Sequence, residues 1–142
     1  MKNTETIILH SEQETIEYGK RLGQQAAPGQ ILALTGDLGA GKTTLTKSIA
    51  AGLGISEMIT SPTFTIVKEY HSGRLPLYHF DVYRIGDIDE MYELGYEEYF
   101  FGSGLCVVEW ADLIEKLIPE EAMWISIAYG EREEERICTC TY

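Results

Sequence analysis

The stretch QILALTGDLGAGKTT, residues 30–44, decides the fold that we expect for this chain. Residues 30–35 form a short apolar run bounded by turn residues, which is typical of a strand buried in a parallel sheet. Residues 36–44 fit the pattern of a glycine, four residues of any kind and then Gly-Lys-Thr, and a helix is predicted over residues 42–53. A strand, a glycine-rich turn and a helix in this order predict a phosphate-binding loop.

Each position of this loop has a chemical task. The glycines let successive backbone N–H groups point at phosphate oxygens, and the positive end of the following helix faces the same anion. Lys42 carries a compact charge to the β- and γ-phosphates of a bound nucleotide, and the Thr43 hydroxyl is a magnesium ligand. The predicted nucleotide-binding residues of the loop are Asp37, Leu38, Gly39, Ala40, Gly41, Lys42, Thr43 and Thr44.

The nucleotide itself is predicted from motifs that the chain lacks. Guanine-specific proteins with such a loop read the base through an Asn-Lys-x-Asp motif, and the sole asparagine here is Asn3, so ATP is expected. The arginines are dispersed at positions 21, 74, 84, 132 and 136, so they predict no arginine-rich lid. Three activities stay open at this point: ATP hydrolysis, phosphoryl transfer to a small molecule, and nucleotide-gated binding without turnover.

Magnesium also needs a carboxylate at the end of a neighbouring buried strand, and two residues qualify. Glu109 ends the apolar run 105–109, and Asp81 follows the run 77–80. Both would lie at the carboxyl edge of a parallel sheet, where sheets of this kind bind their ligands. A helix cap or a surface charge is the alternative role for either carboxylate.

The remaining elements complete a three-layer α/β domain that spans residues 1–142. Besides the loop strand and helix, we expect strands at 6–10, 63–71, 75–82, 105–109, 123–129 and 136–142, and helices at 11–27, 88–101 and 111–118. Strands alternate with helices, and two pairs of strands are predicted hairpins. The expected fold is therefore a P-loop NTPase-like domain with a mixed, mostly parallel central sheet plus β-hairpins.

Charge and composition limit the partners. The chain carries a formal net charge of −12 at pH 7, which repels phosphate backbones, so we expect no strong direct binding to nucleic acid. It has no apolar run near the roughly 20 residues of a membrane span and no signal peptide, so a cytoplasmic protein with free cysteines is expected. The acidic runs 87–98 and 131–135 are solvated faces or a docking surface for a basic partner.

Four stretches together resemble the TsaE family (also called YjeE or YdiB), bacterial ATPases required for threonylcarbamoyladenosine formation in tRNA. They are GDLGAGKTT at 36–44, SPTF at 61–64, HFDVYR at 79–84 and VEWA at 108–111. The loop is shared by many ATPases, whereas the other three stretches together are distinctive. The resemblance implies a weak, Mg²⁺-dependent ATPase, stimulated by its partner. It would act on or regulate the TsaD–TsaB complex, which transfers the threonylcarbamoyl group.

The resemblance also implies roles for single residues. The implied catalytic residues are Lys42, Thr63, Asp81 and Arg84. Thr63 would sense the γ-phosphate from a switch-like loop, with an ordinary strand threonine as the alternative. Arg84, expected on a strand, would stabilise charge in the transition state, with a structural brace as the alternative.

The implied metal ligands are Thr43, Glu109 and Asp81. Glu109 would be the main metal carboxylate, while Asp81 would polarise the attacking water or a metal-bound one. Trp110 would lie near the nucleotide or a partner surface, with a core tryptophan as the alternative. We expect His71 and His79 to be strand residues rather than ligands.

Overall fold

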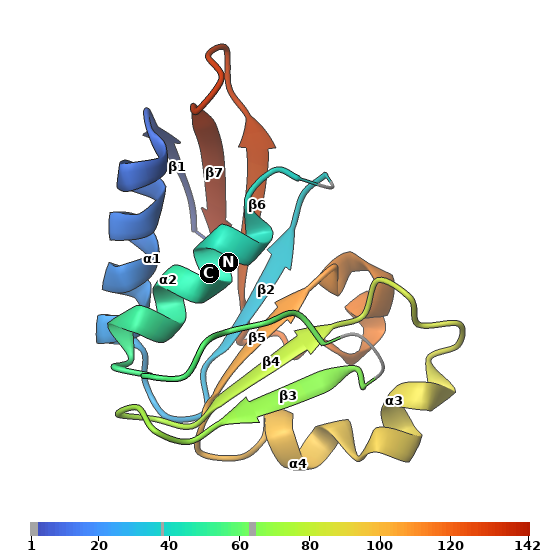
Figure 1. Ribbon diagram of the computed structural model, residues 1–142. Helices are drawn as coiled ribbons and strands as arrows, with labels where there is room; N and C mark the ends of the chain where they lie inside the picture. The colour runs from blue at the N-terminus through green and yellow to red at the C-terminus, as the bar shows by residue number, and fades with distance from the viewer. Residues whose placement is uncertain (1–2, 38, 63–64) are drawn as a thin grey trace.

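The computed structural model describes residues 3–37, 39–62 and 65–142 (Figure 1). Leu38 and Thr63, two of the predicted site residues, lie outside these ranges. The strands are β1 Thr4–Leu9, β2 Ile31–Thr35, β3 Val67–Tyr70, β4 Leu77–Asp81, β5 Leu105–Glu109, β6 Met123–Tyr129 and β7 Arg136–Thr141. The helices are α1 Glu12–Gln25, α2 Lys42–Gly52, α3 Asp89–Leu94, α4 Tyr96–Phe100 and the 3₁₀ helix η1 Ala111–Leu117.

All seven strands form one mixed sheet in the order β1-β7-β6-β2-β5-β4-β3. The four central strands β6, β2, β5 and β4 run parallel, while β1, β7 and β3 pair antiparallel with their neighbours. The predicted mixed sheet and both predicted hairpins, β3–β4 and β6–β7, are therefore confirmed. Strands β2 and β5 lie in the middle, where both faces are covered, which explains why their sequences are continuously apolar.

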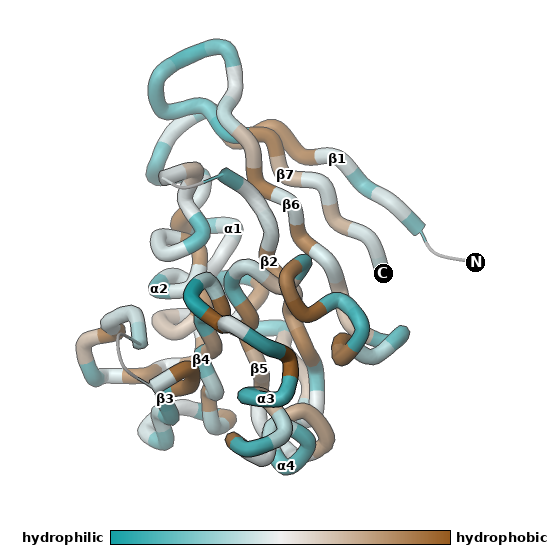
Figure 2. The backbone as a smooth tube through the Cα atoms, turned by 90° about the vertical axis from the view of Figure 1, so that its right-hand side faces the viewer, coloured by the Kyte–Doolittle hydropathy of each residue, from teal (hydrophilic) through white to brown (hydrophobic). Residues whose placement is uncertain are grey.

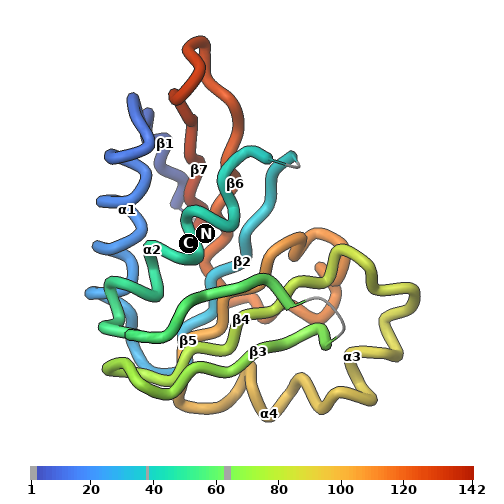
Figure 3. The backbone as a smooth tube through the Cα atoms, viewed as in Figure 1, coloured from blue at the N-terminus to red at the C-terminus, as the bar shows by residue number. Residues whose placement is uncertain are grey.

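Alternate residues of the central strands belong to two separate cores. Leu32 and Leu34 of β2 pack in the cluster that also holds buried residues of α1 and α2. Ile31 and Ala33 pack in the opposite cluster, with residues of α3, α4 and η1. Figures 1 and 3 show α1 and α2 on one side of the sheet and α3 and α4 on the other. The three predicted layers follow from this period-two alternation along each strand.

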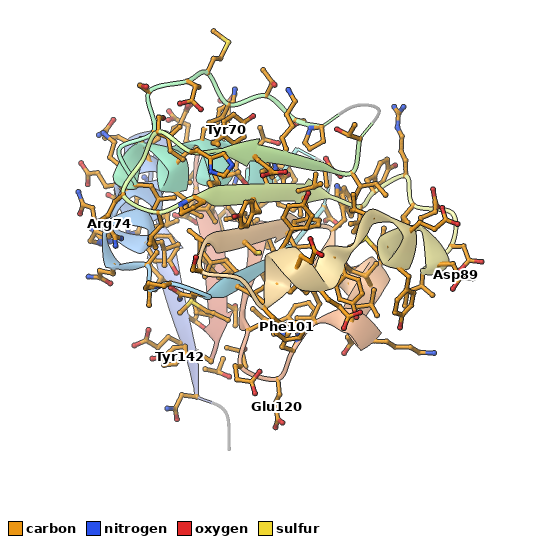
Figure 4. The ribbon with its side chains drawn as sticks, turned by 90° about the horizontal axis from the view of Figure 1, so that it is seen from below. Tyr70, Arg74, Asp89, Phe101, Glu120 and Tyr142 are labelled. Atoms are coloured by element: carbon orange, nitrogen blue, oxygen red, sulfur yellow. The ribbon has the colours of Figure 1, made fainter. Side chains whose placement is uncertain are left out.

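The predicted start of the first helix is confirmed at Ser11. The Ser11 hydroxyl accepts a hydrogen bond from the Glu14 N–H at 3.2 Å, and the Glu14 carboxylate accepts from the His10 N–H at 3.0 Å. At the other end, the Arg74 guanidinium donates to the carbonyl oxygens of Gly23, Gln24 and Ala26. Arg74, labelled in Figure 4, thus caps the C-terminus of α1 from the β3–β4 turn, a contact that the sequence did not predict.

Several local predictions differ from the structure, and one concerns His71, which was expected on a strand but follows the end of β3. The helix predicted over residues 88–101 is divided into α3 and α4, because Gly95 has a φ of 77° and breaks the hydrogen-bond ladder. The helix predicted at 111–118 is the 3₁₀ helix η1, Ala111–Leu117, which contains a kink at Ile114. Arg84, expected on a strand, lies in the turn that follows β4.

The cysteines, the β6–β7 connection and the helices agree with what the composition predicts. Cys106, Cys138 and Cys140 are free and buried. Figure 2 shows the hydrophilic connection between β6 and β7 standing clear of the sheet. Within the described residues, the helices are too short or too polar for any of them to cross a membrane.

Helices α1 and α2 pack closely because glycines occupy their contact. A β-carbon at Gly23 would overlap the carbonyl oxygen of Ile49, and one at Gly52 would overlap that of Lys20. The close approach leaves no room for a side chain, so the helices accept the lower helix propensity of glycine.

We predict that Gly23→Ala lowers the free energy of unfolding by about 1–3 kcal/mol through overpacking. In an isolated helix, alanine is more favourable than glycine by roughly 1 kcal/mol. A loss of stability would therefore indicate the tertiary contact, whereas a gain would indicate helix propensity. Urea unfolding gives the measurement. The control is Gly86→Ala, where the nearest atom to the new methyl group would be a Glu90 carboxylate oxygen at 3.5 Å. A Gly23→Ala protein that is as stable as the wild type would contradict this packing.

Candidate functional site

The glycine-rich loop runs from the end of β2 to the start of α2, and two of its glycines meet different backbone demands. Gly36 has a φ of 145°, and a β-carbon there would overlap the carbonyl oxygen of Ile127 in β6. Gly41 is the N-cap of α2 with a φ of 117°, a conformation that side chains disfavour. The loop is thus held against β6, and it leads directly into the N-terminus of α2, an 11-residue helix.

Lys42 folds back onto its own loop. Its Nζ donates to the carbonyl oxygens of Gly36 at 2.5 Å and Asp37 at 2.8 Å, and lies 4.0 Å from the centre of the Trp110 ring. The residue is only 5% exposed. Burial lowers the pKa of this ammonium, while the nearby Glu109 and Asp37 carboxylates oppose the shift. Among the described residues, no carboxylate is in direct contact with this cation, which is held inside the site by backbone carbonyls.

Glu109 is the carboxylate at the bottom of the site, and it is 2% exposed. Its Oε1 accepts a hydrogen bond from the Thr43 hydroxyl at 3.4 Å, and its Oε2 lies 2.6 Å from His79 Nε2 and 3.3 Å from the Thr46 hydroxyl. Thr43 and Glu109, two of the three predicted metal ligands, are therefore hydrogen-bonded to each other.

Asp81 lies beside Glu109 because the two residues are paired in the register of β4 and β5. Its Oδ1 accepts a hydrogen bond from the Tyr83 N–H at 3.0 Å. Burial raises the pKa of the Asp81 carboxyl, the Tyr83 hydrogen bond opposes this, and the Glu109 charge raises it further. The second predicted carboxylate is thus a half-buried acid next to the first.

These side chains share one cavity of about 320 Å³. It is lined by Gly39, Gly41, Lys42, Thr43, Thr44, Ser61, Asp81, Tyr83, Glu109 and Trp110. Trp110 forms its wall, with a φ of 62° and its ring centre 4.6 Å from that of Tyr83. Trp110 also packs against the core cluster that holds residues of α3, α4 and η1, so its role near the nucleotide stays a prediction. Arg84 is exposed and does not line this cavity.

A second cavity, of about 130 Å³, opens on another side of the same loop. It is lined by Glu12, Thr15, Gly39, Gly41, Thr44, Glu134 and Arg136. Arg136 donates from Nε to the Ala40 carbonyl oxygen at 2.8 Å, and its guanidinium carbon lies 4.8 Å from the centre of the Tyr129 ring. The β6–β7 hairpin therefore braces the loop through Arg136, at the start of β7.

Sequence reasoning missed several members of this site. His79 and Asp81 are two residues apart on β4, and Thr43 and Thr46 are three apart on α2, so each pair shares a face of its element. This periodicity was the available signal for His79 and Thr46. The bracing role of Arg136 depends on a contact with Ala40, 96 residues away in the chain, and no local pattern indicates it.

The oxygen donors fit a hard cation such as Mg²⁺ once a nucleotide is bound. No group of three or more His, Cys, Asp or Glu side chains that could hold a metal occurs within the described residues. Magnesium is usually held by one or two carboxylates together with substrate phosphates and waters, so a complete protein cage is not required. The Thr43 hydroxyl and Glu109 Oε1 are the pair that would face such an ion.

The comparisons with known proteins match one family. The model of the family described as "Threonylcarbamoyl adenosine biosynthesis protein TsaE" matches residues 9–138. The tRNA threonylcarbamoyladenosine biosynthesis protein TsaE of Bacillus subtilis is 53% identical over 125 residues, which cover 88% of this chain and 78% of that protein. The Treponema pallidum protein of the same name is 43% identical over 129 residues, with 89% and 95% covered. The crystal structure of Bacillus subtilis YdiB superposes with a TM-score of 0.85 at 45% identity, covering 99% of this chain and 86% of that one.

We predict that Asp81→Asn raises the melting temperature of the ligand-free protein by a few degrees at pH 7. Asparagine keeps the acceptor for the Tyr83 N–H and removes the charge beside Glu109. Since the folded-state pKa of Asp81 is raised, its ionisation opposes folding above that pKa and ceases to do so below the unfolded value of about 3.9. The gain should therefore shrink as the pH falls from 7 towards 4.

Scanning calorimetry across this pH range measures the difference. The control is Asp112→Asn, an exposed aspartate, which should change the melting temperature little at any pH. A gain for Asp81→Asn that grows on acidification would contradict the assignment.

Proposed function

Since this chain belongs to the TsaE family, we propose that it binds ATP with Mg²⁺, hydrolyses it slowly, and serves threonylcarbamoyladenosine formation in tRNA. One observation carries the nucleotide part of this proposal. Lys42, Thr43, Asp81 and Glu109 come from three elements and line a single cavity at the mouth of the glycine-rich loop. The proposed ATPase unit spans residues 1–142, and its proposed location is the cytoplasm.

Each of these residues has a task in the proposed reaction. Lys42 would exchange the carbonyl oxygens of Gly36 and Asp37 for the β- and γ-phosphate oxygens, in reach of the loop N–H groups. Thr43 and Glu109 would hold Mg²⁺, which when bound neutralises charge on those phosphates. Asp81 would accept a hydrogen bond from the attacking water, since it is beside Glu109 and borders the cavity.

The two cavities support an orientation for the nucleotide. Both are lined by Gly39, Gly41 and Thr44, so a triphosphate that follows the loop would extend from one into the other. The γ-phosphate would lie in the larger cavity, next to Thr43 and Glu109. The nucleoside would then lie on the side of the smaller cavity, between the start of α1 and the β6–β7 hairpin.

The composition of the larger cavity supports a slow, partner-dependent ATPase. Lys42 is the single cationic side chain among the described residues that line it, and Arg84 is outside. Arginines or switch loops supplied by a partner are worth about 10³–10⁵ in rate in related phosphoryl-transfer proteins. Because the chain belongs to the TsaE family, we propose the TsaD–TsaB complex as that partner. The net charge of −12 supports a chain that contacts proteins and leaves tRNA to others.

We predict that Lys42→Ala lowers ATPase activity at least tenfold, a loss of about 1.4 kcal/mol or more in transition-state stabilisation. Lys47→Ala is the matched control, because Lys47 is an exposed lysine on the same helix and does not line the larger cavity. Phosphate release is measured for both variants after circular dichroism has shown that they are folded. Normal turnover by Lys42→Ala would refute the site assignment.

We also predict that the protein alone turns over ATP well below ~1 s⁻¹ and binds TsaD–TsaB more tightly with a non-hydrolysable ATP analogue than with ADP. The γ-phosphate would lie in a cavity bordered by Tyr83, which is 51% exposed, so a partner over this rim would sense it. Calorimetry with each nucleotide measures the two affinities. Equal affinities would favour the small-molecule kinase, which an acceptor screen then tests.

A further inference from the structure

One side chain of the site has no part in the reaction proposed above. His79 lies on β4 and is 0% exposed, and its Nε2 is 2.6 Å from Glu109 Oε2. The two side chains come from neighbouring parallel strands, in which His79 pairs with Val107 and Asp81 with Glu109. His79 therefore lies one step deeper in the sheet than Asp81, behind the carboxylate as seen from the phosphate loop.

The two oxygens of Glu109 have different surroundings. Oε1 faces the Thr43 hydroxyl at 3.4 Å, on the side where a metal would bind. Oε2 faces His79 Nε2 at 2.6 Å and the Thr46 hydroxyl at 3.3 Å. The Thr46 hydroxyl has one proton and also lies 2.9 Å from the Lys42 carbonyl oxygen, the shorter of its two contacts. His79 is thus the donor that holds Oε2.

The other nitrogen of the imidazole indicates why a histidine occupies this position. Among the described residues, His79 Nδ1 is the one buried side-chain nitrogen or oxygen that has no hydrogen-bond partner. An unsatisfied buried polar atom costs about 1–3 kcal/mol, and an apolar side chain would avoid that cost. Because a metal ligand must be an ionised carboxylate, the ring proton belongs on Nε2, and Nδ1 is left as an acceptor without a donor.

We propose that His79 is a positioning residue for the metal carboxylate. By holding Oε2, it stops the Glu109 side chain from rotating and keeps Oε1 directed at Thr43 and at the ion beside it. His79 itself touches neither nucleotide nor metal. This inference rests on the proposed function, because it assumes that Glu109 is the magnesium ligand. Loss of such an outer partner typically lowers metal affinity or activity by about 10–100-fold.

The test measures the dissociation constant of a non-hydrolysable ATP analogue by calorimetry, once with Mg²⁺ and once with EDTA. The ratio of the two constants is the magnesium enhancement. We expect His79→Leu to lower this enhancement at least about tenfold while the affinity in EDTA stays within about twofold of the wild type. The control is His71→Leu, an exposed histidine in the turn of the β3–β4 hairpin, which should keep the full enhancement.

A pair of polar variants separates positioning from packing and covers the case in which His79→Leu does not fold. The amide nitrogen of His79→Gln reaches the position of Nε2, whereas that of His79→Asn reaches only the position of Nδ1. We expect His79→Gln to retain most of the enhancement and His79→Asn to lose it.

Three outcomes would overturn the inference, and they differ in whether they also overturn the proposed function. Full enhancement in both His79→Leu and His79→Asn, or equal loss in His79→Gln and His79→Asn, would overturn it and leave the proposed function intact. A wild-type protein that binds the analogue equally well with Mg²⁺ and with EDTA would overturn the proposed function and this inference together.

Discussion

Burial of the Glu109 carboxylate constrains how the strands and α2 pack around it. An ionised carboxylate withdrawn from water is tolerated only where hydrogen-bond donors and opposite charge replace its hydration. His79 on β4 and the hydroxyls of Thr43 and Thr46 on α2 surround it, and Lys42 supplies the nearby cation. The order β2-β5-β4 places these groups together, because β5 carries Glu109 between the strand that leads into the loop and the strand that carries His79.

The charged side chains of the site are arranged unfavourably with respect to one another. Two carboxylates lie side by side at the ends of β4 and β5. Lys42, the one cationic side chain among the described residues that line the cavity, is turned towards backbone carbonyls. Such an arrangement opposes folding, and the proposed cation and phosphates would relieve it by adding positive charge beside the carboxylates and drawing Lys42 outward. Because the whole chain is acidic, attraction for the proposed nucleotide would have to come from this local geometry rather than from the overall field.

The sequence predicted best the parts in which local chemistry decides the structure. The buried strands β2 and β5 are continuous apolar runs, the loop has glycines where the backbone needs them, and Ser11 caps α1. Gly95 was a visible break signal, yet the acidic, helix-favouring residues around it led to one predicted helix in place of α3 and α4.

The contacts that join distant segments were not predictable from one sequence. Arg74 caps α1 about 50 residues earlier, Arg136 braces Ala40, and His79 binds Glu109 30 residues later. Each depends on strand order and register, which a local pattern does not encode. The proposed roles of Leu38 and Thr63 concern positions outside the described residues and stay predictions.

Side chains along β4 and β5 alternate between the two faces of the sheet, which limits where the chain can gain or lose residues. Odd-numbered residues His79, Asp81 and Glu109 face α2, while even-numbered Phe80 and Val108 fill the opposite core. Deleting one residue within either strand would exchange these two sets. The acids would then face an apolar core, and a phenylalanine or a valine would face the phosphate-binding loop. Insertions and deletions among related chains should therefore accumulate in connections such as residues 130–135, while the spacing from residue 77 to 81 and from 105 to 109 stays constant.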